Sequence, residues 1–174
     1  MGAGKTSVGR ELAKGLAWEF LDLDDVIEAV ERRTVPEIFA AEGEPHFRTI
    51  ERRELERVLR ERTSPTILSV GGGAFAEAGS AELVGRYGAI SVLLDAPVEE
   101  LRRRVNSSEN HRPLAQHRER FLKLYGERQQ AYARAQQRFD TAGKTVEQVA
   151  REIADWVRNK FASTGHKPGD GGNG

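Results

Sequence analysis

The stretch Gly2-Ala3-Gly4-Lys5-Thr6-Ser7 decides the fold of this chain. Gly4, Lys5 and Thr6 fill the last three positions of the phosphate-loop pattern G-x-x-x-x-G-K-[ST], whose first glycine would precede Met1. In such a loop, successive backbone N–H groups turn toward phosphate oxygens, the lysine contacts the outer phosphates, and the threonine hydroxyl can bind Mg²⁺. On the fragment alone, an ordinary glycine-rich N-terminus remains the alternative.

The residues after the loop predict a helix. Val8, Leu12 and Leu16 recur at helical spacing, while the residues between them are mostly polar. The N-terminus of this helix would place partial positive charge at the loop. Loop and helix together predict a nucleotide-phosphate site.

Strands and helices alternate along the rest of the chain. The expected strands are 20–24, 66–70, 89–94 and 138–141. The expected helices include 34–43, 44–62, 80–87, 118–135 and a last helix capped by Thr145. This alternation predicts an α/β fold with a parallel sheet, in which ligands bind at the carboxyl ends of the strands.

Length and composition exclude several classes of protein. The 174 residues suit one domain, are 38% hydrophobic and include no apolar run of membrane-spanning length. The absence of cysteine excludes disulfides and thiolate metal sites, and 27 basic against 27 acidic residues argue against nucleic-acid or membrane partners. We expect one folded domain over residues 1–160, with a polar loop at 106–117, and a disordered tail over 161–174.

Asp22 and Asp24 follow the first predicted strand. If the strand continues through both, their side chains point the same way, where one could orient the water shell of a metal and the other accept a proton. They could equally begin a helix, as Asp25 is expected to do.

A run of three glycines, Gly71-Gly72-Gly73, follows the predicted strand 66–70. Such a run suits a backbone that approaches a ligand closely, although a plain flexible loop has the same composition. Arg48, Arg112 and Arg128, each taken alone, are typical of solvated surface charges.

Together these features resemble the shikimate kinases, small P-loop kinases related in fold to the nucleoside monophosphate kinases. The resemblance covers Met1 to about Trp156 and rests on six motifs: Gly2-x-Gly4-Lys5-Thr6, Asp22-x-Asp24, Phe47-Arg48-x-x-Glu51, Gly71-Gly72-Gly73, Arg112-Pro113-Leu114 and Arg128-x-x-x-Tyr132. It implies a three-layer P-loop kinase fold, with substrate-binding helices at about 34–62 and a lid at about 106–117.

The resemblance implies an ATP site and a metal site near the loop. The expected ATP-binding residues are Gly2, Ala3, Gly4, Lys5, Thr6, Ser7 and, from the lid, Arg112. Thr6 is expected to bind Mg²⁺ directly and Asp22 through water.

It also implies a substrate site. Arg48 and Arg128 would clamp a carboxylate, Asp24 would contact the substrate hydroxyls, and the glycines Gly71, Gly72 and Gly73 would offer backbone groups. The expected catalytic residues are Lys5, Asp24 as the base, and Arg112.

The implied activity is transfer of the γ-phosphate of ATP to the 3-hydroxyl of shikimate, with Mg²⁺, by a cytoplasmic monomer of aromatic amino acid biosynthesis that binds neither nucleic acid nor membrane. Two alternatives stay open: a P-loop kinase for another hydroxylated metabolite such as gluconate, and a catalytically silent nucleotide-binding module.

Two departures from the family pattern bear on these expectations. The helix after the lid commonly contains R-x-P-L-Y, whereas this chain has Arg128-Gln129-Gln130-Ala131-Tyr132. The first strand of the family, which is central in the sheet, is absent. We therefore expect the strands to fall into two separate pairs, and the native chain to begin upstream of Met1.

Overall fold

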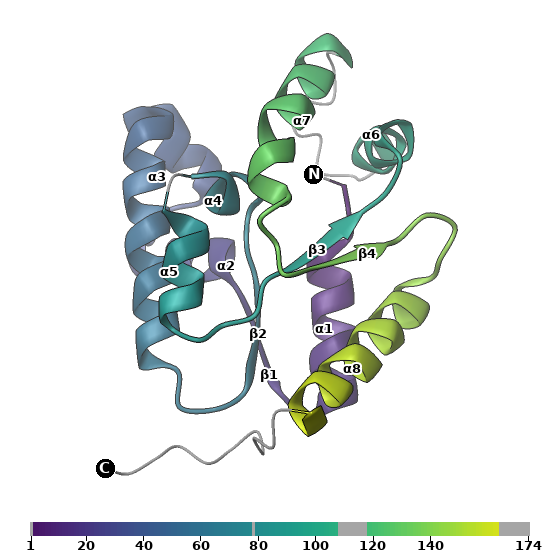
Figure 1. The fold of residues 1–174 in the computed structure, drawn as a ribbon. Coiled ribbons are helices and arrows are strands. Elements are labelled where there is room, and N and C mark those ends of the chain that lie inside the picture. Colours follow the sequence, from purple (N-terminus) through teal and green to yellow (C-terminus); the bar gives the residue numbers. More distant parts are fainter. Residues whose placement is uncertain (1, 78, 108–117, 164–174) are drawn as a thin grey trace. The chain divides into compact units, whose positions relative to one another are not determined.

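The computed structural model describes residues 2–77, 79–107 and 118–163 (Figure 1). In chain order their elements are α1 (Lys5–Leu16), β1 (Glu19–Asp22), α2 (Leu23–Glu31), α3 (Val35–Glu61), β2 (Thr66–Ser69), α4 (Gly72–Ala76), α5 (Ser80–Arg86), β3 (Val92–Asp95), α6 (Val98–Ser107), α7 (Arg118–Tyr132), β4 (Gln137–Asp140) and α8 (Val146–Ser163). They form two compact units. The β1–β2 unit comprises Thr6–Val70 and Thr145–Gly174, and the β3–β4 unit comprises Met1–Lys5 and Gly71–Lys144.

The β1–β2 unit is built on two parallel strands, paired from Glu19 opposite Thr66 to Asp22 opposite Ser69. Helix α1 lies close to β1 at Gly9, where an added Cβ would stand 2.7 Å from a ring carbon of Phe20. Any larger residue at this position would force the helix and the aromatic ring apart. The apolar face of α8 is buried in the same unit through Val149, Ala150, Ile153, Ala154 and Val157.

Helix α3 begins and bends where its sequence predicts. The Thr34 side chain accepts a hydrogen bond from the Glu37 N–H, and the Glu37 carboxylate accepts one from the Thr34 N–H at 2.7 Å, which completes a capping box. Gly43 has φ 80° and ψ 175°, so the helix is kinked there. Glycine adopts this positive φ without the steric cost that a side chain would add. The expected division into two helices at Gly43 is therefore confirmed.

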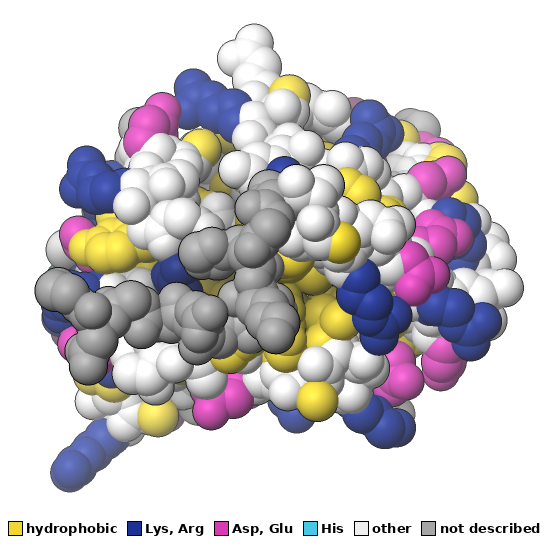
Figure 2. Space-filling view, turned by 60° about the horizontal axis from the view of Figure 1, so that its bottom comes forward, with side chains coloured by type: hydrophobic (Ala, Val, Ile, Leu, Met, Phe, Trp, Pro, Cys, Tyr) yellow, Lys and Arg dark blue, Asp and Glu magenta, His cyan; other side chains and the backbone are white. Residues whose placement is uncertain are grey.

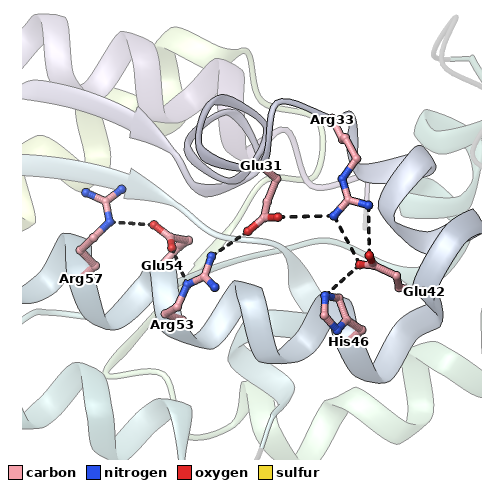
Figure 3. A network of polar contacts seen from close by, with 7 residues as sticks. All are labelled: Glu31, Arg33, Glu42, His46, Arg53, Glu54 and Arg57. Atoms are coloured by element: carbon pink, nitrogen blue, oxygen red, sulfur yellow. Dashed lines mark hydrogen bonds and ion pairs between the residues drawn. The ribbon is translucent and has the colours of Figure 1, made fainter.

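A network of ion pairs joins α2 to α3 within this unit (Figure 3). Arg53 of α3 bridges Glu31 of α2 at 2.7 Å and Glu54 of its own helix at 2.8 Å, and Arg57 contacts Glu54 at 2.7 Å. The Glu54 side chain is only 2% exposed. Burial acts to raise its pKa, but hydrogen bonds from the two guanidinium groups outweigh this, and the net pKa lies below its usual value. Glu54 is therefore held inside the unit as a carboxylate.

The β3–β4 unit is built on a second parallel pair, running from Val92 opposite Gln137 to Asp95 opposite Asp140. One cluster of its buried core is formed by Ala3, Ala96, Leu101 and Phe121. Arg104 of α6 donates to the hydroxyl and the carbonyl oxygen of Thr141, at 2.9 and 2.8 Å, and so ties the helix to the end of β4.

The pairing of strands confirms the expected α/β fold with parallel strands and its division into two pairs: in the described part of the chain, each sheet has two strands. The expected helix ending in Arg102-Arg103-Arg104 continues to Ser107. Residues 106 and 107 of the expected loop are therefore helical, and its residues 108–117 lie outside the described residues.

Four further predicted boundaries were wrong by two residues or more. The helix predicted at 118–135 ends at Tyr132. The first strand ends at Asp22 rather than at residue 24, because the Asp22 carboxylate caps α2. The strand predicted at 89–94 is Val92–Asp95, since the Ala89 N–H is used to close α5 through the Val84 carbonyl at 3.1 Å. Helix α8 continues to Ser163, past the expected start of the tail at 161. Residues 164–174 of the expected tail lie outside the described residues.

Candidate active site

The phosphate-loop segment has the backbone that its glycines predict. Gly2 and Gly4 have φ values of 67° and 75°, a conformation that L side chains rarely adopt. Between them Ala3 is 6% exposed and packs in the core of the β3–β4 unit. Helix α1 begins at Lys5, directly after the loop. The segment thus presents a glycine turn at a helix N-terminus, which is the arrangement that favours anions.

Thr6 and Asp22 lie together in the β1–β2 unit, although sixteen positions separate them. The Thr6 hydroxyl donates to Asp22 Oδ2 at 2.8 Å, and Asp22 Oδ1 accepts from the N–H of Asp24 at 3.2 Å. Both oxygens of Asp22 are therefore oriented, one by the residue after the lysine and one by the first turn of α2. Asp24 lies within that turn and is partly buried. The expectation that β1 continues through both aspartates is wrong, and the helix-start alternative describes the backbone.

The hydroxyl and carboxylate oxygens of Thr6 and Asp22 are the hard donors that Mg²⁺ prefers. Across residues 2–77, 79–107 and 118–163 no group of three or more His, Cys, Asp or Glu side chains could hold a metal ion. Mg²⁺ that accompanies a nucleotide is commonly bound through one or two protein carboxylates together with substrate phosphates and water. These residues therefore fit Mg²⁺ brought with a nucleotide.

Arg48 is held on α3 by two carboxylates. Its Nε and Nη2 donate to Glu44 at 3.3 and 2.8 Å, and its Nη1 donates to Glu51 at 2.5 Å. The Glu51 side chain is 2% exposed and that of Arg48 17%. Burial acts to lower the pKa of Arg48, but the two carboxylates outweigh it, and the pKa is raised. The guanidinium is thus permanently charged and oriented by residues three and four positions away on the same helix.

The triple glycine and Arg128 meet in the β3–β4 unit. Gly72 and Gly73 begin the short helix α4, which packs against α7. A Cβ added at Gly72 would lie 3.4 Å from Nη1 of Arg128 and 2.4 Å from the hydroxyl of Tyr132. The expected approach of this backbone to a ligand stays a prediction, but Gly72 is closely approached by other groups. The groups it approaches are side chains of the protein itself.

The sequence-predicted site residues are thus distributed over both units. Thr6, Ser7, Asp22, Asp24 and Arg48 belong to the β1–β2 unit, whereas Gly2, Ala3, Gly4, Lys5, Gly71, Gly72, Gly73 and Arg128 belong to the β3–β4 unit. The structure brings Thr6 into contact with Asp22, and Gly72 close to Arg128. Arg112 lies outside the described residues.

Two residues near these sites were not predicted to act there. Glu44 was not singled out, although its spacing of four residues from Arg48 on a helix is a signal for an ion pair. Tyr132 was noted only as a motif residue, and its contact with Gly72 spans sixty positions, so no local pattern could reveal it.

The surface drawn in Figure 2 carries Lys and Arg side chains interspersed with Asp and Glu, in keeping with the balanced composition. None of the helices in the described ranges combines the length and the apolar character needed to cross a membrane.

Comparison with known proteins places these features in one family. The profile of the family "Shikimate kinase" matches residues 1–158. Shikimate kinase of Geobacter metallireducens is 41% identical over 163 residues, which cover 92% of this chain and 89% of that protein. Shikimate kinase of Caulobacter vibrioides (strain NA1000 / CB15N) is 44% identical over 155 residues, which cover 87% of this chain and 75% of that protein.

Solved structures give the same result. Shikimate kinase from Acinetobacter baumannii in complex with shikimate superimposes with a TM-score of 0.80 at 35% identity, covering 92% of this chain and 89% of that one. The enzyme from Aquifex aeolicus gives a TM-score of 0.79 at 26% identity, covering 95% of each chain. The P-loop kinase fold expected from the motifs is confirmed, and the chain belongs to the shikimate kinase family.

Proposed function

We propose that this chain transfers the γ-phosphoryl group of ATP to the 3-hydroxyl of shikimate, giving shikimate 3-phosphate and ADP. The observation that carries the proposal is the extent of the family match: it runs over residues 1–158, and every residue expected in the site lies within that stretch. One relative of the same fold was solved in complex with shikimate.

The phosphate loop binds the nucleotide in this proposal. Gly2, Gly4 and the N-terminus of α1 supply backbone N–H groups to the phosphates, and Lys5 supplies a charge to the outer ones. Thr6 and Asp22, the latter through water, would hold Mg²⁺, which supplies charge neutralisation at the phosphates when bound. The hydrogen bond between Thr6 and Asp22 supports this assignment because it orients both oxygens before any ligand arrives.

The acceptor is bound by charge and by hydrogen bonds. Arg48 and Arg128 clamp the carboxylate of shikimate, a planar group that suits guanidinium forks. Gly71, Gly72 and Gly73 line the acceptor site with backbone. Asp24 accepts the proton of the attacking hydroxyl, and its position in the first turn of α2, next to the oriented Asp22, supports this role. Arg112, from the lid, stabilises the charge of the transferred group.

A coupled assay of ADP release tests the proposal. The protein is given ATP and Mg²⁺ with shikimate, with gluconate, or with no acceptor. Turnover that depends on shikimate and is at least tenfold faster than with gluconate supports the proposal. Equal turnover with both acceptors, or ATP binding without any turnover, would contradict it in favour of the other two functions.

We also propose that the enzyme acts as a cytoplasmic monomer, in line with its lack of cysteine and with ATP as a substrate. Size-exclusion chromatography with light scattering tests the monomer, since a stable dimer would elute with twice the chain mass of 19.3 kDa.

A further inference from the structure

Tyr132 is the last residue of α7 and makes a long-range contact to the glycine run. Its hydroxyl donates to the carbonyl oxygen of Gly72 at 3.1 Å, across sixty positions of sequence and within the β3–β4 unit. Because a trans peptide is planar, the direction of the Gly72 carbonyl also sets the direction of the Gly73 N–H. The hydroxyl of Tyr132 therefore orients one peptide of the glycine run.

Gly72 is required here for space rather than for an unusual backbone. It lies in the first turn of α4, and an added Cβ would stand 2.4 Å from the Tyr132 hydroxyl oxygen but 3.6 Å from the ring carbon that carries it. The first distance is far inside van der Waals contact and the second is an ordinary contact. The hydroxyl alone thus excludes a side chain at this position.

Arg128 stands one helical turn before Tyr132 on α7, so both side chains lie on the same face of the helix. Nη1 of Arg128 would lie 3.4 Å from a Cβ at Gly72, which places the guanidinium against the same glycine. One turn of α7 therefore presents an anchor and a cation to a single peptide of α4.

We propose that Tyr132 is a positioning residue for the acceptor site: its hydrogen bond to Gly72 holds α4 against α7 and thereby sets the spacing between the glycine-run backbone and the guanidinium of Arg128. This inference rests on the proposed function, in which those two groups receive shikimate. We expect the effect to fall on the acceptor more than on ATP, because the hydrogen bond of Tyr132 is made to the glycine run.

The first test compares Tyr132→Phe with Tyr125→Phe in steady-state kinetics, with shikimate and ATP varied separately. Loss of one neutral hydrogen bond corresponds to a factor of roughly 3–10. We expect Tyr132→Phe to raise the KM for shikimate by about that factor, with the KM for ATP changed less than about twofold. Tyr125 lies on the same helix, near Asp95. Burial, and to a smaller extent the negative charge of Asp95, raises the pKa of the Tyr125 hydroxyl. Its replacement should leave both KM values unchanged. An unaltered KM for shikimate in Tyr132→Phe, or an equal rise for both substrates, would overturn the proposal.

The second test uses suppression. Gly72→Ala should lower kcat/KM for shikimate strongly, because its methyl group meets the Tyr132 hydroxyl. Adding Tyr132→Phe to Gly72→Ala removes that clash, so the double variant should recover at least about tenfold in kcat/KM over Gly72→Ala. A double variant no better than Gly72→Ala contradicts the inference.

Failure of the proposed function would be seen separately, as a wild-type protein that does not phosphorylate shikimate. The contact is then tested by thermal unfolding, without ligand, of the wild type, Tyr132→Phe, Gly72→Ala and the double variant. A melting temperature that falls in Gly72→Ala and recovers in the double variant supports the packing of Tyr132 on Gly72, and a lack of recovery refutes it.

Discussion

The buried carboxylate of Glu54 offers a quantitative test of how α3 is held in the β1–β2 unit. Oε1 of Glu54 accepts from Nε of Arg53 at 2.8 Å, and Oε2 accepts from Nε of Arg57 at 2.7 Å. The side chains of Arg53 and Arg57 are 56% and 39% exposed, so water already solvates part of each guanidinium. When one arginine is replaced, the other still pairs with the Glu54 carboxylate. Replacing either arginine with methionine, a good helix former, should therefore cost only about 1 kcal/mol, near the low end for a hydrogen bond to a charge.

Replacing both arginines should cost far more than the sum of the single changes. A carboxylate that is 2% exposed would then lie in the unit without a cation, for which the destabilisation is about 3–5 kcal/mol. The expected coupling is therefore about 1–3 kcal/mol, and subtracting the single variants removes the separate contributions of the Arg53–Glu31 and Arg57–Glu61 pairs. Adding Glu54→Gln to the double variant removes the buried charge and should restore most of the loss.

Urea unfolding at pH 7 and pH 5 measures these quantities. In the wild type the pKa of Glu54 is lowered, so its contribution to stability is complete above its unfolded pKa and is lost as pH falls through the folded value. In the double variant burial without a cation should raise this pKa, and the deficit relative to wild type should shrink between pH 7 and pH 5. Single costs that add up to the double within about 0.5 kcal/mol, or a triple variant as unstable as the double, would refute the reasoning.

Three further outcomes concern the proposed active site. Asp24→Asn should lower kcat by about 10²–10⁴-fold with an unchanged melting temperature, and retention of more than roughly a tenth of the wild-type kcat would remove Asp24 from the role of base. Arg48→Lys and Arg128→Lys should each weaken shikimate binding, measured by calorimetry, much more than ATP binding, since lysine keeps the charge and loses the planar fork; unchanged affinity in both would show that the carboxylate clamp is assigned wrongly. Arg112→Ala should lower kcat with a smaller effect on the KM for shikimate, and a kcat equal to wild type would argue against a part for the lid.

The phosphate loop and the caps illustrate how much local sequence determined here. Gly4 and Lys5 predicted the glycine turn and the helix behind it, Thr34 with Glu37 predicted the start of α3, and Gly43 predicted its kink. Each of these features depends on groups no more than four residues apart, so short patterns contain the physics that decides them. The alternation of strands and helices predicted the fold class for the same reason.

The tertiary structure decided what depends on distant partners. Strand β1 ends at Asp22 because pairing with β2 competes there with capping of α2. The alternation of apolar and polar residues in the sequence cannot decide which of the two prevails. The need for glycine at position 72 comes from a hydroxyl sixty residues away. Glu54 and Arg57 are typical of an exposed helix face by composition, yet Glu54 is buried because Arg53 and Arg57 neutralise it where α3 packs on α2. Burial and long-range hydrogen bonds arise only when segments far apart in sequence meet, and they therefore leave no local pattern from which they could be predicted.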